Sequence, residues 1–297
     1  MTKEIEEFVT SFDKLGYVVD EELATILFLM TNLQKPLLLE GNPGVGKTEL
    51  ANMLAAHLDT ELIRLQCYEG LDVHSSIYEW NYQKQLLSIK IWENDARTEK
   101  EKEKLIFGRD FILERPLLKA ITAQDKAPVL LIDEIDRADE EFEAFLLELL
   151  SANQISIPEL GTIKAKFPPI VILTSNRTRE LSDALRRRCL YHWMNYPDPE
   201  KELRIVRKKL PTIEERLAEQ LVKAVQILRT KKLDKSPGIS ETLDWARSLQ
   251  ALKKTELDED GISKTMGSLL KSQNDIERVK AEGLANMLED ADIERKS

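Results

Sequence analysis

The sequence is poor in cysteine, in long apolar runs and in surplus positive charge, and each shortage excludes a class of protein. It has two cysteines, Cys67 and Cys189, among 297 residues. They lack the spacing of a disulfide framework or a zinc site. The longest apolar run, near residues 26–30, is too short to span a membrane. We therefore expect a cytoplasmic protein without membrane insertion.

Positive charge is outnumbered along the chain. There are 53 acidic and 43 basic residues, which gives a formal net charge of −10. A general binder of nucleic-acid phosphates would carry the opposite sign, so we expect no nucleic-acid partner. The amino-terminal residues are acidic rather than basic, unlike a targeting leader. Repeats and low-complexity tracts are also absent, and the length suits one large or two modest domains.

The strongest feature that is present is the stretch GNPGVGKT, residues 41–48, called the phosphate loop below. It fills the pattern G-x-x-x-x-G-K-[ST] between a predicted buried strand and a predicted helix, the context that the pattern requires. Glycines let backbone N–H groups close around phosphate oxygens, and the helix N-terminus adds partial positive charge. Lys47 would reach the β- and γ-phosphates, and the Thr48 hydroxyl would hold Mg²⁺. We assign nucleotide binding to Gly41, Asn42, Pro43, Gly44, Val45, Gly46, Lys47, Thr48 and Glu49.

A second informative stretch is PVLLIDEID, residues 128–136. Four consecutive apolar residues predict a strand buried on both faces, as a parallel sheet between helix layers requires. Two carboxylates follow at its carboxyl end. Asp133 suits the orientation of Mg²⁺ through its water shell, and Glu134 suits the polarisation of an attacking water.

Polar residues also follow a third predicted strand. Residues 169–176 end on Asn176, which we interpret as a hydrogen-bond partner of the attacking water or the γ-phosphate. The alternative is a cap for the following polar segment. Further on, Arg186, Arg187 and Arg188 are either a solvated charge run or a clamp for phosphate, including phosphate bound by a neighbouring subunit.

The rest of the chain follows simpler patterns. Apolar spacing predicts helices over 20–33 and 139–150, a strand over 61–67 and a hairpin near 152–166. The Glu- and Lys-rich residues 92–104 are interpreted as a solvated helix. Residues 77–82 contain three aromatic side chains, which either face a partner or form a satellite core. Beyond Pro197 the pattern is helical throughout, with helices predicted over 200–210, 214–229, 240–252, 262–270 and 275–288.

Taken in this order, the phosphate loop, the acidic pair, Asn176, the arginine run and the helical module resemble an AAA+ ATPase. The phrases GYVVDEE, PLLLEG, PELG and ALRRRC resemble the MoxR family. LQCYEGLD and YEWNY are similar to the subset that includes the carbon monoxide dehydrogenase maturation (CoxD-like) ATPases. The resemblance covers roughly residues 15–285.

The resemblance implies an α/β fold, a P-loop NTPase αβα core with a five-stranded parallel sheet, followed by a small all-helical lid domain. The core would span residues 1–197, with an insertion near 70–85 and the hairpin near 152–166. The lid would span 198–288, followed by a frayed tail over 289–297.

By position, the resemblance also implies roles for site residues. Lys47 and Thr48 correspond to Walker A, Asp133 and Glu134 to Walker B, and Asn176 to sensor 1. Arg188 best matches an arginine finger that acts in trans, with Arg187 as its close competitor. A finger in trans implies a ring, usually a hexamer. The family's sensor 2 arginine is replaced here by Thr242, and Arg247 is the residue that would substitute for it.

We therefore expect a ring ATPase that binds ATP and Mg²⁺ and remodels or matures a client protein. In this family the client is often a metalloenzyme, and a von Willebrand A-domain protein is the adaptor. The missing sensor 2 arginine motivates an alternative, a nucleotide-gated scaffold with little turnover of its own. A DNA motor of the same superfamily is disfavoured by the acidity of the chain.

Overall fold

The computed structural model describes residues 2–93, 97–158 and 160–281, and the chain divides into two compact units. The first contains the chain up to Phe8, Glu21–Glu40 and Thr48–Trp193. The second contains Val9–Asp20, Gly41–Lys47 and the described chain from Met194 on. The predicted tail, the end of the last predicted helix and Glu159 of the PELG phrase lie outside the described residues. The predicted domain limits remain predictions.

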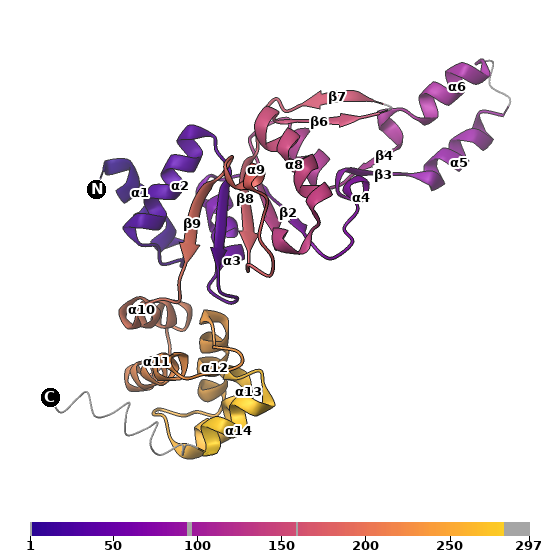
Figure 1. Ribbon diagram of the computed structural model, residues 1–297. Helices are drawn as coiled ribbons and strands as arrows, with labels where there is room; N and C mark the ends of the chain where they lie inside the picture. Colours follow the sequence, from indigo (N-terminus) through magenta and orange to yellow (C-terminus); the bar gives the residue numbers. More distant parts are fainter. Residues whose placement is uncertain (1, 94–96, 159, 282–297) are drawn as a thin grey trace. The chain divides into compact units, whose positions relative to one another are not determined.

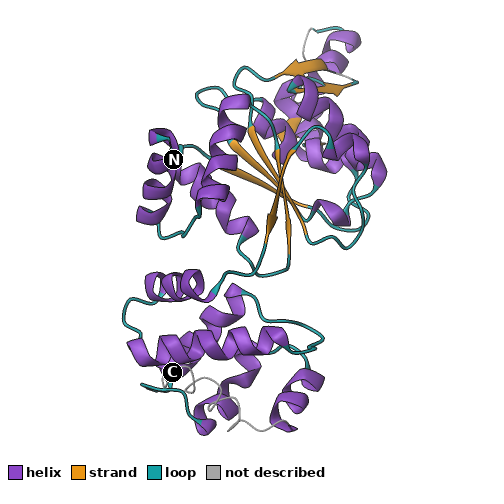
Figure 2. Cartoon of the chain, turned by 60° about the vertical axis from the view of Figure 1, so that its left-hand side comes forward, coloured by secondary structure: helices purple, strands orange, loops and turns teal. Residues whose placement is uncertain are grey.

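The first unit is built on a five-stranded parallel sheet in the order β2-β5-β8-β1-β9. The strands are β1 (Leu37–Gly41), β2 (Leu62–Gln66), β5 (Val129–Asp133), β8 (Ile170–Ser175) and β9 (Leu190–Met194). Helices cover both faces of this sheet (Figure 2), so β1 and β5 are buried along their whole length. The predicted αβα core with a parallel sheet is confirmed.

The register of the sheet brings polar strand ends together. Gln66 lies beside Asp133, and Glu40 lies beside Ser175. β5 and β8 pair side by side between them. Because parallel strands all end at the same edge, these residues share the carboxyl edge of the sheet.

The helices of the first unit pack the sheet through one apolar face each. In α8 (Glu140–Ala152), the buried residues Phe142, Leu146 and Leu149 join the core cluster beside β5. Asp139 begins this helix by accepting a hydrogen bond from the Phe142 N–H. Other helices are α1 (Lys3–Lys14), which the sequence analysis missed, α2 (Glu21–Leu33), α3 (Lys47–His57), α4 (Val73–Ile77), α7 (Pro116–Ile121) and α9 (Asp183–Arg186).

A long segment between Tyr78 and Glu114, called the arm below, begins and ends with a short strand and extends from the first unit. β3 (Tyr78–Trp80) and β4 (Ile112–Glu114) pair antiparallel, and α5 (Tyr82–Ile91) and α6 (Glu99–Ile106) lie beyond them. Figure 1 shows these two helices projecting away from the sheet. The arm thus runs well past residue 85.

The helix predicted over residues 92–104 is wrong in its bounds. Trp92 instead ends α5, with its ring against that of Phe111 at 6.1 Å. Thr98 begins α6 through a reciprocal capping box with Glu101. A run of alternating charges hid this start, because it has no apolar period.

The hairpin and the aromatic segment pack on the first unit. β6 (Gln154–Ile157) pairs antiparallel with β7 (Gly161–Lys164), and Ile155 and Ile157 join the core. In the aromatic segment, Tyr78 packs against the core and Trp80 packs edge-to-face on Phe107. Tyr82, in contrast, is 68% exposed. The segment is therefore packed at Tyr78 and Trp80 and exposed at Tyr82.

The carboxyl-terminal part of the second unit is all-helical, as predicted. Its helices are α10 (Pro199–Lys209), α11 (Glu215–Thr230), α12 (Ile239–Ala251), α13 (Glu259–Leu269) and α14 (Gln273–Ala281). Trp245 is fully buried in their shared core, and its indole N–H donates to the Thr265 hydroxyl at 2.7 Å. Among the described helices of the whole chain, none combines the length and apolar character needed to cross a bilayer.

A buried ion pair ties these helices together. Arg229 donates to both carboxylate oxygens of Glu202, at 2.6 and 2.8 Å, and Glu202 is fully buried. The Thr242 hydroxyl donates to the same carboxylate at 2.8 Å. Thr242, at the expected sensor 2 position, is therefore a structural partner of Glu202.

We predict that Arg229→Ala destabilises the helical part by about 3–5 kcal/mol, because it leaves the Glu202 charge buried without its cation. Arg247→Ala is the matched control. Arg247 pairs with Asp244 on the exposed surface, and such a pair contributes at most about 1 kcal/mol. Urea unfolding followed by circular dichroism measures both variants. Equal losses in the two would contradict this account of the ion pair.

Candidate functional site

The phosphate-loop threonine and the strand carboxylate meet at the carboxyl edge of the sheet. The Thr48 hydroxyl lies 3.2 Å from both oxygens of Asp133, which is 3% exposed. These two residues come from distant parts of the chain, and the sequence analysis predicted both as metal ligands. A hydroxyl and a carboxylate are the oxygen donors that a small, hard divalent cation prefers. In the described part of the chain, no group of three His, Cys, Asp or Glu forms a separate metal cluster.

Thr174 fixes the acidic pair, although the sequence analysis did not single it out. Its hydroxyl donates to Asp133 Oδ1 at 2.5 Å and accepts the Glu134 backbone N–H at 2.9 Å. Glu134 has φ +55°, a left-handed conformation that is costly for a residue with a side chain. Thr174 is buried, so it holds this turn from inside the sheet.

The Glu134 carboxylate has two polar neighbours. Asn176 Nδ2 donates to Oε1 at 3.4 Å, and Arg137 Nε lies 2.9 Å from Oε2. The buried Asp136 accepts the backbone N–H groups of Asn176 and Thr178, at 3.2 and 2.8 Å, which fixes the turn after β8. The structure thus brings Glu134 and Asn176 together, and it adds Arg137 and Asp136 to the predicted set.

Arg64 is the other residue that the sequence analysis missed. Its Nε and Nη2 donate to Asp133 Oδ2 at 3.0 and 2.6 Å, and Nη2 also donates to Gln66 Oε1 at 2.6 Å. Alternate residues of a strand share a face, so Arg64 and Gln66 both point toward Asp133 from β2. The one sequence signal that could have drawn attention to it is a charged residue inside a predicted strand.

The phosphate loop has backbone reasons for its glycines. Gly44 and Gly46 have φ of +74° and +97°, where a side chain would be strained. A Cβ on Gly41 would lie 2.3 Å from the Met194 carbonyl oxygen. Lys47 is buried, and its ammonium group donates to the carbonyl oxygens of Gly41 and Asn42 at 2.8 and 2.9 Å. The Lys47 side chain therefore folds back onto the backbone of the first two residues of the phosphate loop.

Other parts of the second unit contact this loop. The Gly44 carbonyl oxygen accepts the N–H of Ile239 at 2.9 Å, so the first turn of α12 lies against the loop. The Tyr17 hydroxyl donates to the Gly46 carbonyl oxygen at 3.2 Å. Arg247, the expected substitute for a sensor 2 arginine, pairs instead with Asp244 at 3.1 Å.

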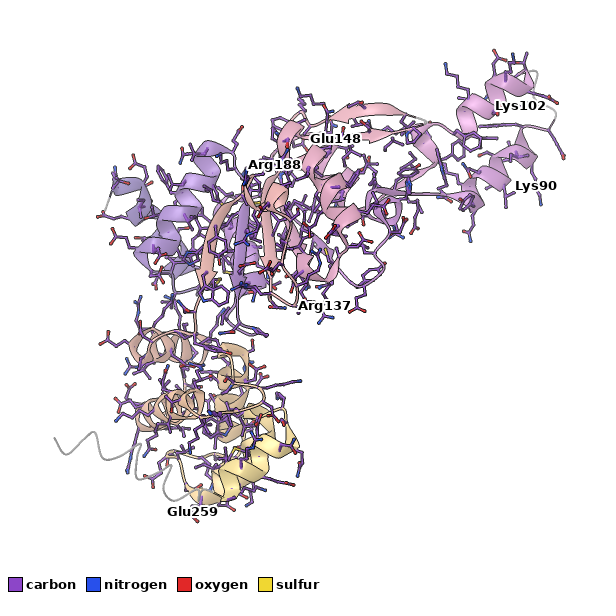
Figure 3. The ribbon with its side chains drawn as sticks, in the orientation of Figure 1. Lys90, Lys102, Arg137, Glu148, Arg188 and Glu259 are labelled. Atoms are coloured by element: carbon purple, nitrogen blue, oxygen red, sulfur yellow. The ribbon has the colours of Figure 1, made fainter. Side chains whose placement is uncertain are left out.

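The arginine run lies at the other edge of the sheet. Arg188 comes just before β9, whereas Asp133 and Glu134 follow the end of β5, and the strands are parallel. Figure 3 shows Arg188 and Arg137 at opposite ends of the strands. Arg188 donates to Ser151 Oγ at 2.7 Å and to the Ala184 carbonyl oxygen at 2.9 Å. The chain thus keeps this run away from its own acidic pair.

Both cysteines are poor nucleophiles in this fold. Burial raises the pKa of Cys67 to about 12, and the negative charges of Asp133, Asp136 and Glu134 raise it further. Burial also raises the pKa of Cys189 to about 12, with a small opposing effect from Arg188. Neither thiol therefore has a role as an attacking group at neutral pH.

Comparison with known proteins gives a consistent result. The family described as "AAA domain (dynein-related subfamily)" matches residues 36–189, just over half of the chain. An uncharacterized protein of Staphylococcus aureus is 29% identical over 227 residues, which are 74% of this chain and 76% of that protein. An uncharacterized protein of Staphylococcus haemolyticus is 27% identical over 239 residues, which are 78% and 81% of the two chains.

Solved structures of RuvB from Thermotoga maritima share the fold. One single-residue variant aligns with a TM-score of 0.51 and 19% identity, covering 90% of this chain and 72% of RuvB. Another variant gives the same TM-score and identity over 88% and 73% of the two chains. At this identity, the likeness concerns the fold alone.

We predict that iodoacetamide at pH 8 leaves both cysteines of the folded protein largely unmodified. With a pKa of about 12, roughly one thiol in 10⁴ is ionised at that pH. Labelling should accelerate as pH rises and should be complete in urea, where both thiols regain an ordinary pKa. Mass spectrometry of digested samples locates the label. Rapid labelling of Cys67 in the folded state would contradict the burial of this thiol beside the acidic pair.

Proposed function

This chain belongs to the dynein-related subfamily of AAA domains, and we propose that it is an ATP-hydrolysing, chaperone-like ring ATPase that remodels or matures a client protein. The single observation that carries the proposal is the contact of Thr48 with Asp133 at the sheet edge where Glu134 and Asn176 also meet. Such a set performs phosphoryl transfer to water by positioning and electrostatics.

The residues would divide the reaction among them. The phosphate loop and Lys47 bind the β- and γ-phosphates, while Thr48 and Asp133 hold Mg²⁺, which neutralises phosphate charge when bound. Glu134 accepts a proton from the attacking water, and Asn176 orients that water. The water oxygen bonds to the γ-phosphorus as the bond to the bridging oxygen breaks, giving ADP and phosphate. Lys47 and Arg137 must exchange their present partners for this arrangement.

We infer that the arginine finger of each site comes from the next subunit of a ring, so that turnover depends on assembly. Arg188 and Arg187 are both exposed, at the edge of the sheet opposite the acidic pair. β9 alone separates these edges by about 16 Å, at 3.3 Å for each of its five residues. A head-to-tail contact between copies would bring one copy's arginines to its neighbour's phosphates, and such contacts close into rings. We propose a hexamer.

The finer assignment is to the MoxR family, near its CoxD-like subset. It is supported by the sequence phrases that resemble this family, several of which surround the site. On this assignment the client is a protein or a metalloenzyme complex, and the adaptor is a von Willebrand A-domain protein. We propose a cytoplasmic location, since two free thiols suit a reducing compartment.

The arm is the part of the first unit best suited to contact a client. α5 exposes Leu86, Leu87 and Ile91, while the polar Gln85 of the same helix is buried. Exposed apolar residues gathered on one projecting element are typical of a protein-binding surface. Two lysines accompany them on α5, and Figure 3 labels one of these, Lys90, near the end of the arm.

A second candidate function is a nucleotide-gated scaffold with little turnover of its own. The observation that favours it is the buried position of Thr242, bound to Glu202 where the family carries a sensor 2 arginine. Arg247, the expected substitute, pairs with Asp244 on the exposed surface of α12, which also supports this candidate. Absence of turnover at every concentration, with and without an adaptor, would favour the scaffold.

We predict that Glu134→Gln keeps ATP binding and lowers turnover by about 10²–10⁴-fold, because an amide cannot accept the proton of the attacking water. Glu141→Gln, on the exposed face of α8, removes the same charge away from the site and serves as the control. Steady-state phosphate release and binding of a fluorescent ATP analogue measure the two effects. Normal hydrolysis by Glu134→Gln would refute the role assigned to Glu134.

We predict that Arg188→Ala assembles with nucleotide but loses about 10³-fold or more of its turnover, since an arginine finger contributes that much. Wild-type activity per subunit should rise with protein concentration as rings form. Arg187→Ala tests the competing assignment, and Arg186→Ala is the control from the same run. Sizing by light scattering accompanies each assay. Full activity of both Arg187→Ala and Arg188→Ala would contradict shared sites.

A further inference from the structure

The carboxylate assigned to the metal is already occupied by a cation of the protein. Two nitrogens of Arg64 donate to Asp133 Oδ2, while Oδ1 accepts the short hydrogen bond of Thr174. Mg²⁺, bound directly or through its water shell, needs lone pairs of this same carboxylate. From this contact we infer that Arg64 competes with Mg²⁺ for Asp133, so that the metal binds only as the Arg64 side chain leaves Oδ2.

The exposures of the two partners show which of them can move. The Asp133 side chain is 5% exposed and is held by Thr174 on one oxygen, so it stays in place. The Arg64 side chain, in contrast, is 50% exposed. Leaving Asp133 therefore returns Arg64 to water at small cost, whereas two cations on one carboxylate would repel each other.

A resting position for the displaced side chain is also present. Arg64 Nη2 donates to Gln66 Oε1 at 2.6 Å, one pleat further along the same face of β2. Arg64 can keep this bond while it releases Asp133, so the guanidinium group remains at the carboxyl edge. Arg64 is thus a positioning residue that sets the metal affinity of Asp133, and it does not itself touch the metal.

The inference rests on the proposed function, because it concerns the metal of that same site. It predicts that Arg64→Gln, which removes the charge, tightens metal binding to the ADP-bound protein about three- to tenfold, the amount expected for a half-exposed charge-assisted pair. Arg64→Lys keeps a positive charge and should remain near the wild type. Nucleotide affinity measured without metal should be unchanged in both variants.

Mn²⁺ serves as the probe, and electron paramagnetic resonance counts the free ion in titrations of the full-length chain with saturating ADP. Arg115→Gln is the matched control, because Arg115 is also half-exposed in an ion pair, with Glu79 at 2.6 Å at the base of the arm. Fluorescent ADP without metal gives the second readout. If Arg64→Gln merely loosened the site, the affinities for Mn²⁺ and for ADP would both fall. If Arg64 competes with the metal, the Mn²⁺ affinity rises and the ADP affinity stays unchanged.

The outcomes separate this inference from the function on which it rests. If the wild type binds neither ADP nor Mn²⁺, the proposed function fails. If it binds both, and Arg64→Gln leaves Mn²⁺ affinity unchanged or weaker, the competition is refuted while the function stands. If Arg64→Gln does not fold, Arg64→Lys decides. Mn²⁺ affinity near the wild-type value supports the competition, because lysine keeps the competing charge. Mn²⁺ affinity well below the wild-type value refutes it, because the substitution has then only loosened the site.

Discussion

The structure depends on keeping a carboxylate charged while it is almost wholly removed from water. An unpaired buried charge is so unfavourable that every neighbour of Asp133 is a donor: a threonine from the phosphate-loop helix, a threonine from β8 and an arginine from β2. These three donors lie on three different elements around β5, so the order of strands in the sheet is what brings them to Asp133. The helical part of the second unit solves the same problem at Glu202 with Arg229 and Thr242.

The two solutions differ in purpose. Around Glu202 the side chains of Arg229 and Thr242 are buried, so the ion pair is fixed and specifies how the helices pack. Around the acidic pair, the arginines that neutralise Asp133 and Glu134 are about half exposed. Charges held by such mobile partners can be exchanged for other cations without unfolding the sheet. Fixed ion pairs suit the packing of helices, and ion pairs whose cation can be replaced suit a binding site.

The sequence predicted the parts of the fold that repeat a strong local pattern. β5 and β8 were evident as apolar runs ending on polar residues, and the phosphate loop carried its own spacing. The strands of the arm were missed because three residues are too few to show alternation, and α1 was missed among acidic residues. For the candidate site, Asp133, Glu134 and Asn176 were predicted because each lies at the carboxyl end of a predicted buried strand. Thr174, Arg64 and Arg137 were not, since only the register and the turn reveal what they face.

The arm is fastened to the first unit at a single narrow base. The Arg115 N–H donates to the Ile77 carbonyl oxygen at 3.0 Å, so the chain departs and returns at adjacent points. The segment beyond β3 and β4 can change length with little effect on stability, because the entropy of closing a loop grows only with the logarithm of its length. Replacement of α5 and α6 would therefore leave the carboxyl edge of the sheet unchanged, so the length and surface of the arm can vary independently of that edge.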